Sequence, residues 1–370
     1  VLDMGTGSGI QALTAAENPN VKEIVAVDVN EDAIEQLKGK KIRKIKPLLS
    51  DLFDNVHGHF ETIFFNPPYL PADEREDAES ALATTGGKHG WEISEKFFQE
   101  VAGFLFHYGK IFYVFSSLTG QDKIDQIITE NMLEFKEVDH EQVQNETLYL
   151  YEVWKSELLK SLQSKGVENL RYFTHGKRGN IYTGTVDKSK FEKKFINTKK
   201  NLVKVGIKVK REESKAVNRI QNEAKWLLKL NKEGIGPRML FYDAKFVVYE
   251  FVEGELVHDW IKTASKKQIQ DMLRNMLQQC FIMDKLKVNK EEMHHPFKHV
   301  VVTKHAPILL DFERCHETEK PHNVTQFIEF ICRLRKELGE FTFSIEYLRG
   351  LAKEYKDGKF LIESIQRAIQ

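Results

Sequence analysis

The apolar positions divide the chain into two stretches with different patterns. Before about residue 155, short apolar runs alternate with segments whose apolar residues recur every three or four positions. Buried strands that alternate with amphipathic helices predict an α/β domain with a doubly wound, mostly parallel sheet and helices on both faces. Strands are expected at 1–4, 24–29, 44–49, 62–65 and 110–115, helices at 10–16, 33–37, 93–106 and 124–132, and a closing antiparallel hairpin at 135–143 and 147–153.

The pattern changes after a short amphipathic stretch that ends before Gly166. From about residue 167 several strand-like runs come first, followed by one helix, two more strands and a mostly helical remainder. Strands followed by helices are typical of an α+β fold and not of a doubly wound sheet. We therefore predict a first domain at 1–155, a linker at 156–166 and a two-lobed second domain at 167–370.

Composition excludes some classes of protein. The chain has 55 Lys plus Arg and 55 Asp plus Glu, so its balanced charge gives no argument for a nucleic-acid or membrane surface. No apolar run approaches the roughly 18 residues that a bilayer requires, and no signal peptide is visible. Cys280, Cys315 and Cys332 form no C-x-x-C pair, which favours a reducing cytoplasm. Because Val1 already lies in a predicted core strand, we expect the natural N-terminus to be missing.

A glycine-rich turn follows the first predicted strand and opens a helix. Its spacing is G-x-G-x-G, which differs from the G-x-G-x-x-G of dinucleotide-binding loops. Glycines let the backbone turn sharply and approach a ligand, and the helix N–H groups beyond them suit a small polar one. The alternative is a plain strand-to-helix turn. The residues of this candidate cofactor site are Asp3, Gly5, Thr6, Gly7, Ser8 and Gly9.

Two acidic residues end the next predicted strands. Asp28 lies about 20 residues beyond the glycines, where a carboxylate accepts hydrogen bonds from ribose hydroxyls. Asp51, followed by Leu52, ends the third strand and is placed to meet an adenine amino group. A helix or turn cap is the equally good interpretation of Asp51.

Asn66-Pro67-Pro68-Tyr69 follows the apolar run 63–65. The two prolines fix φ and remove two backbone donors, so the Asn66 side chain and the loop carbonyls can accept from an NH₂ group. Tyr69 can stack on a flat substrate group. An amide nitrogen is a poor nucleophile, so orientation and electrostatics must supply most of the catalysis. This motif therefore indicates methylation of a planar amide or amine nitrogen, with Asn66, Pro67 and Tyr69 as catalytic candidates and Pro68 as a further substrate contact.

Together these motifs resemble the HemK-type class I methyltransferases. The resemblance covers residues 1 to about 155 and includes the later stretch 86–92. It implies a Rossmann-like fold, S-adenosylmethionine held by the glycine turn and Asp28, and a glutamine held by residues 66–69. The implied substrate is the glutamine of the Gly-Gly-Gln motif in class I peptide-release factors, and some relatives need a small activator subunit.

The Asn-Pro-Pro-Tyr motif is shared with adenine-N6 methyltransferases that act on DNA or RNA. This keeps a nucleic-acid substrate open as the alternative. The balanced charge disfavours it, because nucleic-acid binding usually needs a basic surface.

The second domain contains a candidate nucleotide site. Gly176 and Gly179 lie in a predicted hairpin that can cover nucleotide phosphates. Lys208 lies inside an apolar strand, where a charge needs a partner, and Glu223 lies beside the apolar stripe of the following helix. A Lys–Glu pair between a strand and a helix is the arrangement of protein kinases.

Asp311-Phe312-Glu313 follows an apolar run and occupies the D-F-G position, where Asp311 would bind magnesium. With the preceding features it resembles small atypical kinases: the RIO type, the KEOPS-complex kinase and archaeal predicted Ser/Thr kinases. The resemblance covers about 167–335 and implies ATP and Mg²⁺ as ligands.

The H-x-D catalytic loop of kinases has no direct counterpart. Glu292 falls where the catalytic Asp is expected, and Lys298 or His299 lies near the position of the metal-binding Asn. A working kinase and a nucleotide-binding pseudokinase that recruits a partner both fit this departure. His294, His295 and His299 lack a recognisable set of zinc ligands, so we favour a catalytic-loop or surface role for them.

Overall fold

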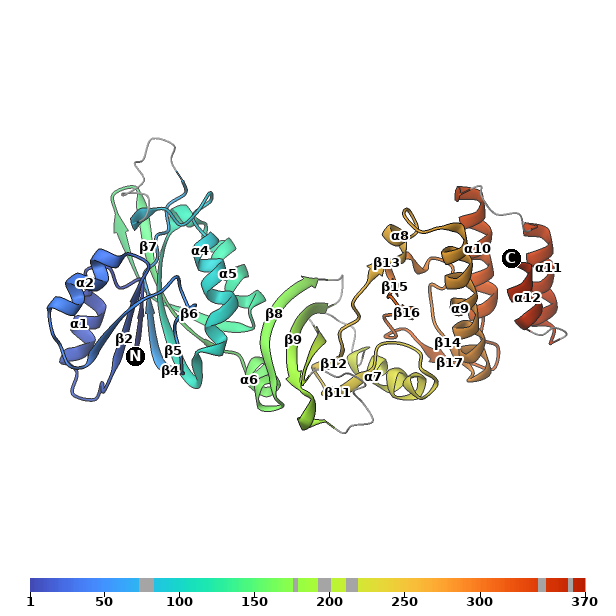
Figure 1. Ribbon diagram of the computed structural model, residues 1–370, viewed down its shortest axis with the longest axis horizontal. Coiled ribbons are helices and arrows are strands. Elements are labelled where there is room, and N and C mark those ends of the chain that lie inside the picture. The colour runs from blue at the N-terminus through green and yellow to red at the C-terminus, as the bar shows by residue number, and fades with distance from the viewer. Residues whose placement is uncertain are drawn as a thin grey trace. The chain divides into compact units, whose positions relative to one another are not determined.

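The computed structural model describes residues 1–72, 83–175, 179–191, 201–210, 219–338, 344–358 and 362–369. The chain divides into two compact units, Val1–Tyr172 and Phe173–Gln370 (Figure 1). The division falls inside strand β8 (Val167–His175). In the described ranges no helix combines the length and the apolar character that crossing a membrane requires.

The first unit is built on a seven-stranded sheet with the order β3-β2-β1-β4-β5-β7-β6. Strands β1 to β5 run parallel, whereas β7 is antiparallel to β5 and to β6. Because β1 lies between β2 and β4, the strand order reverses beside β1, the place where open α/β sheets bind ligands. This confirms the predicted doubly wound α/β fold of the first unit. The strands are β1 Leu2–Met4, β2 Ile24–Asp28, β3 Ile45–Leu49, β4 Phe60–Phe65, β5 Leu105–Ser116, β6 Leu133–Val143 and β7 Glu146–Lys155.

The helices of this unit follow the predicted order, with one error. The helix expected at 93–106 ends at Glu100, and a short 3-10 turn at Val101–Gly103 leads into β5 at Leu105. Val101 and Leu105 are buried, so the apolar spacing continues through the turn, but Leu105 pairs with Phe60 of β4. Pairing between strands therefore overrides the helical pattern here. The helices are α1 Ile10–Glu17, α2 Glu31–Gly39, α4 Glu92–Glu100, α5 Gln121–Glu130 and α6 Glu157–Ser164.

Aromatic packing fixes α4 against the end of β4. The ring of Phe65, the last residue of β4, stacks on Phe97 of α4 with 4.0 Å between centroids. Phe97 also contacts Phe98 edge to face, and both are completely buried. Since the Asn66 loop leaves the sheet directly after Phe65, this contact holds the start of the loop in place.

The second unit begins with a five-stranded sheet in the order β11-β12-β10-β9-β8. Its other strands are β9 Gly179–Asp187, β10 Leu202–Lys210, β11 Met239–Tyr242 and β12 Phe246–Glu250. Helix α7 (Arg219–Leu230) buries an apolar stripe that includes Ile220, Ala224 and Leu227. Glu223 lies on the same buried side.

The rest of the second unit is mainly helical. Helix α9 (Lys266–Lys285) begins with a capping box in which Ser265 and Gln268 satisfy each other's backbone N–H groups. Its buried stripe joins one apolar cluster with α10 (Asn323–Leu338) and α11 (Ile345–Lys356). The remaining elements are β13 Glu255–Leu256, α8 Val257–Trp260, β14 Val288–Asn289, β15 Val300–Val302, β16 Pro307–Leu309, β17 His316–Glu317 and α12 Ile362–Ala368.

Candidate active site

A cavity of about 300 Å³ lies at the carboxyl ends of β1, β2 and β4. Residues from three separate predicted motifs meet in its wall. The lining also includes Asn30, Ser50 and Lys96, which sequence reasoning missed because they belong to no motif. The predicted residues among the lining are Gly5, Gly7, Asp28, Asp51, Leu52, Asn66 and Pro68.

The glycine turn is tied to the end of β2. The Gly7 N–H donates to Asp28 Oδ2 at 2.7 Å, and the other oxygen of Asp28 accepts from the N–H of Asn30 at 2.9 Å. Gly9 has φ 81°, and a Cβ on it would lie 2.7 Å from a methyl carbon of Leu37. Both the left-handed backbone and this close approach require glycine. The turn is thus held between the helix behind it and the carboxylate beside it.

Asp3 supports the turn from below. Its side chain is 1% exposed, and its Oδ2 accepts from the Thr6 hydroxyl at 2.6 Å and from the Ala12 N–H at 3.0 Å. Burial raises the pKa of Asp3 from 3.8 to about 6, against the opposing effect of these two bonds, and the nearby Asp28 adds to the rise. In the described structure Asp3, Thr6, Ser8 and Gly9 lie outside the cavity lining, so their part in cofactor binding stays a prediction.

Asn66 is exposed at the end of β4 and lines the cavity, whereas Pro67 beside it is buried. Tyr69 is partly buried, and its carbonyl accepts from the Thr119 hydroxyl at 2.9 Å. Burial raises the pKa of Tyr69, and the carboxylate of Glu146 adds to this. Pro67 and Tyr69 lie outside the described lining, so their roles toward a substrate stay predictions.

The stretch 86–92 packs closely against the Asn66 loop. A Cβ on Gly86 would lie 2.6 Å from the Pro68 carbonyl oxygen, and one on Gly90 would lie 2.5 Å from that of Tyr69. Two glycines are therefore needed for the two backbones to touch. The Gly86 N–H also donates to the Leu70 carbonyl at 2.9 Å. The acceptor loop is thus braced by this stretch and by Thr119, whose role no sequence motif signals.

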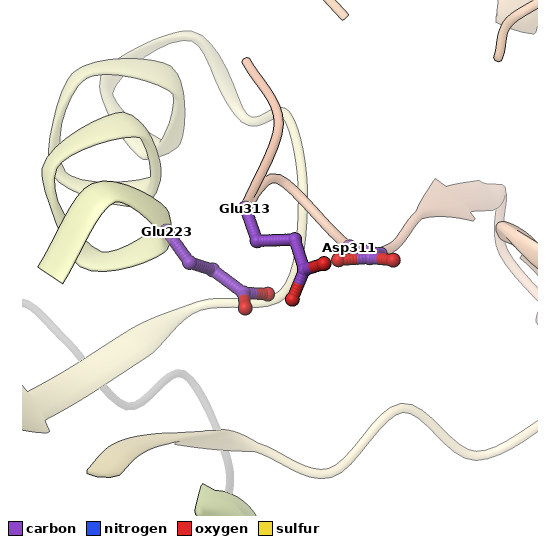
Figure 2. Close-up of side chains that lie close together, drawn as sticks. All are labelled: Glu223, Asp311 and Glu313. Carbon is purple, nitrogen blue, oxygen red and sulfur yellow. The ribbon is translucent and has the colours of Figure 1, made fainter. Parts of the chain in front are cut away.

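In the second unit a buried lysine is surrounded by three carboxylates. Lys208 Nζ lies 2.8 Å from Glu223 Oε2, 2.9 Å from Asp311 Oδ1 and 3.2 Å from Glu313 Oε2. Figure 2 shows the carboxylates turned toward one another, Glu223 from α7 and the other two from the loop after β16. Burial alone would lower the pKa of Lys208, but the three carboxylates outweigh it and hold this pKa well above its ordinary value.

The carboxylates differ in how they respond to the lysine. Burial would raise the pKa of Asp311, yet Lys208 and Lys290 hold it below its ordinary value. Glu223 is more deeply buried, and burial raises its pKa despite Lys208. Oxygen atoms of the three carboxylates lie within 4.8 Å of one another, a spacing that suits a divalent cation. Glu313, which Arg219 also contacts at 3.3 Å, was missed because only Asp311 fits the motif.

Glu292 and His299 lie next to this cluster. Glu292 has φ 68°, its Oε1 accepts from Arg314 at 2.8 Å, and its Oε2 lies 3.2 Å from His299 Nε2. His299 Nδ1 lies 3.7 Å from Asp311 Oδ2. Burial lowers the pKa of His299, and the cation of Lys290 lowers it further, against the two carboxylates. The imidazole of His299 thus lies between the carboxylates of Glu292 and Asp311.

Other residues predicted for the nucleotide site lie apart from Lys208 and its three carboxylates or outside the described residues. Gly179 begins β9 and pairs with Lys210, whereas Gly176 lies outside the described residues. Lys298, His294 and His295 are exposed. In the described ranges, the one group of three or more metal-ligating residues is Glu223, Asp311 and Glu313, so no zinc site of three histidines is found.

Lys290 is a further residue that sequence reasoning missed. It is 3% exposed, and its Nζ donates to the backbone carbonyl of Asp311 at 2.6 Å. Its own N–H donates to the side chain of buried Asn323 at 2.8 Å. Asp311 has φ 60°, a left-handed backbone that is strained for a residue with a Cβ. Lys290 therefore stabilises the conformation that turns the Asp311 carboxylate toward Lys208.

Comparison with known proteins finds relatives of the first unit. Residues 1–143 match the family model "Methyltransferase small domain". Over 126 residues the chain is 40% identical to a putative protein N5-glutamine methyltransferase of Methanocaldococcus jannaschii, covering 33% of this chain and 64% of that one. Identity to the release factor glutamine methyltransferase of Streptococcus pneumoniae is 28% over 33% of this chain and 47% of that protein. Identity to the ribosomal protein uL3 glutamine methyltransferase of Francisella tularensis is 29% over 28% of this chain and 37% of that protein.

The first unit is therefore similar to protein-glutamine methyltransferases, and its residues 1–143 match the model of the methyltransferase small domain. The chain spans from about a third to just under two thirds of the length of these three relatives. The solved structure of the bifunctional kinase-methyltransferase WbdD aligns with all of this chain and 82% of its own, with 12% identity and a TM-score of 0.43.

Proposed function

We propose that the chain is an S-adenosylmethionine-dependent N-methyltransferase that modifies a glutamine side chain of a class I peptide-release factor. The observation that supports this proposal is the position of Asn66, which lines the same cavity as Gly5, Gly7 and Asp28. A cavity that joins a glycine turn and a ribose-binding carboxylate to an amide-gripping side chain suits transfer between a nucleoside-linked donor and an amide. S-adenosylmethionine would supply the methyl group.

The braced loop explains how a weak nucleophile is oriented. The Thr119 hydroxyl donates a hydrogen bond to the carbonyl of Tyr69, and the Gly86 N–H donates to that of Leu70. We assign the two N–H bonds of a glutamine amide to the Asn66 side chain and to a proline carbonyl of residues 67–68. Holding both bonds fixes the nitrogen lone pair toward the methyl donor, and the proton leaves after transfer. The loop supplies orientation and electrostatics and no strong base.

The choice of substrate is supported by what the relatives share. The three names all specify glutamine, one in release factors and one in ribosomal protein uL3. We take the release factor as the substrate because the motif resemblance points to it. Methylation of adenine N6 in nucleic acid is disfavoured by the balanced charge of the chain.

The test uses the full chain, tritiated S-adenosylmethionine and three acceptors: a class I release factor, ribosomal protein uL3 and an adenine-containing oligonucleotide. Label on the Gly-Gly-Gln glutamine is expected, in reactions run with and without a small activator subunit. Asn66→Ala should remove the label, whereas Asn20→Ala, which changes an exposed loop residue, should not. Label on uL3 or on the oligonucleotide alone would replace the proposed substrate.

For the second unit we infer a nucleotide-binding site. The observation behind this is the buried pair between Lys208 and Glu223, because such a pair positions a lysine toward nucleotide phosphates. Gly176 and Gly179 would lie over the phosphates, Asp311 would bind the metal ion, and Glu292 would stand at the base position. The donor set fits a divalent cation, since carboxylate oxygens gather around Asp311.

Binding and phosphoryl transfer are separated by one variant pair. Fluorescent ADP should bind the wild-type chain, and Lys208→Ala should weaken this binding, whereas Lys204→Ala on the exposed part of the same strand should not. A kinase also shows autophosphorylation that Lys208→Ala removes. A pseudokinase shows nucleotide binding without autophosphorylation, and absence of ADP binding by the wild type would end the nucleotide proposal.

A further inference from the structure

His299 lies between two carboxylates that face its two ring nitrogens. Its Nε2 is 3.2 Å from Glu292 Oε2, and its Nδ1 is 3.7 Å from Asp311 Oδ2. The first distance lets the ring N–H donate to the Glu292 carboxylate, and the second is too long for a hydrogen bond. The two sides of the ring therefore have different environments.

The hydrogen bond to Glu292 decides which nitrogen is free. A carboxylate accepts, so Nε2 carries the proton, and in the neutral ring Nδ1 keeps its lone pair. Among the described residues Nδ1 is a buried atom without a hydrogen-bond partner. A buried nitrogen in this state loses its solvation without compensation, which is costly unless something else binds it.

Asp311 presents the matching oxygen. Lys208 Nζ donates to Asp311 Oδ1 at 2.9 Å, while Oδ2 is the oxygen that faces His299 Nδ1. Two donor atoms that share one ion, each about 2.1 Å from it, can lie at most about 4.2 Å apart. The observed 3.7 Å falls inside that limit, so one cation can bind both without a large movement.

The geometry points to a divalent transition-metal site formed by His299 Nδ1 and Asp311 Oδ2, with Glu292 as the carboxylate that orients the imidazole. This rests on the proposed nucleotide site and specifies which metal that site prefers. A histidine that binds a metal through one nitrogen usually donates its other N–H to a carboxylate, which is the arrangement found here.

The nitrogen ligand determines the class of ion. Magnesium is a hard cation that takes oxygen ligands, whereas imidazole favours first-row transition metals. A site of carboxylates alone would suit magnesium equally well. The alternative role of His299 is a spacer that only hydrogen-bonds Glu292 and separates it from Asp311, and a spacer would never contact the ion.

Manganese is the probe, because its pulsed electron paramagnetic resonance spectrum detects directly bound nitrogen. The full chain is measured with Mn²⁺ alone and with Mn²⁺ and ADP. We expect modulation from ¹⁴N that changes to the ¹⁵N pattern when the protein is labelled with [¹⁵N]histidine. His299→Asn should remove the modulation and weaken Mn²⁺ binding about tenfold or more. His294→Asn, a change of an exposed histidine in the same loop, should do neither.

Glu292→Gln gives a second test that keeps both metal ligands. It should retain the nitrogen modulation but weaken Mn²⁺ binding about tenfold, because the imidazole loses its orienting carboxylate. The inference is overturned if the wild type shows no nitrogen modulation in either sample, or if the modulation survives in His299→Asn. If ADP still binds in those cases, the nucleotide site stands and only the metal assignment fails. If ADP does not bind, but the modulation is present in the wild type and lost in His299→Asn, the metal assignment stands and the nucleotide site fails.

Discussion

Asp3 supports the glycine turn with a buried carboxylate. Asp3→Asn tests whether the charge of this carboxylate lowers the stability of the folded chain. In the folded chain both hydrogen bonds, from Thr6 and from Ala12, go to the same oxygen of Asp3. Asparagine can keep its Oδ1 at that position and so retain both bonds. The substitution then removes the buried charge with little change in shape.

The magnitude follows from the pKa of Asp3, which burial raises from 3.8 to about 6. A raised pKa in a carboxyl group means that the folded state binds the proton more tightly than the unfolded state. The stabilising contribution is therefore complete below pH 3.8 and is lost as the pH rises through about 6. The loss amounts to about 3 kcal/mol. Asparagine does not titrate, so its variant loses nothing over the same range.

The assay is urea unfolding of the wild type and of Asp3→Asn at several values between pH 4 and pH 7.5. The free energy of unfolding of the variant, relative to the wild type, should increase by about 2.5 kcal/mol across this range, because part of the change already occurs below pH 4. The baseline difference at pH 4 is set by the amide and does not affect the slope. Parallel curves would refute the reasoning, because Asp3 would then titrate alike in the folded and unfolded chain.

Three further substitutions test other contacts. Lys208→Met removes the cation that three carboxylates share and should lower the free energy of unfolding of the second unit by about 3–5 kcal/mol. Lys204→Met, which loses only a contact with the Phe251 ring, should lower it by less than about 1 kcal/mol. Both are measured by urea titration followed by tryptophan fluorescence. Gly86→Ala places a Cβ 2.6 Å from the Pro68 carbonyl and should reduce methyl transfer up to about 100-fold, whereas Gly103→Ala, with nothing within 4 Å, should not. Thr119→Val removes the bond to Tyr69 and should cost about 1–3 kcal/mol and lower the methylation rate, while Thr119→Ser should restore both.

The sequence predicts the first unit well because its signals are local. Apolar runs of four to six residues alternate with segments of helical apolar spacing. They predict where the strands lie along the chain without reference to long-range contacts. The error at 101–106 has the opposite cause. Leu105 is a strand residue only because Phe60, which is 45 positions earlier (105 − 60), pairs with it. No local pattern carries that information.

The site residues divide in the same way. Asn66, Asp28, Gly5 and Gly7 line one cavity and also carry a sequence signal, because the proposed chemistry would need those residue types at fixed places beside strand ends. Thr119 is 50 positions from Tyr69, and its hydroxyl could equally have capped a turn. Residues that only position others, among them Lys290 and Glu313 in the second unit, have no required spacing, so they are visible only in three dimensions.

Asp3 and Asp311 show that burial alone does not decide the behaviour of a carboxylate. Both are strongly desolvated, yet the pKa of Asp3 rises and that of Asp311 falls. The difference is in the neighbours: Asp3 has neutral donors and the negative Asp28, whereas Asp311 has the cations of Lys208 and Lys290. A lowered pKa contributes stability above pH 3.8 that is lost only in stronger acid, and a raised one gives the reverse. Acidification from pH 7 to pH 5 should therefore favour folding through Asp3 and leave the contribution of Asp311 intact.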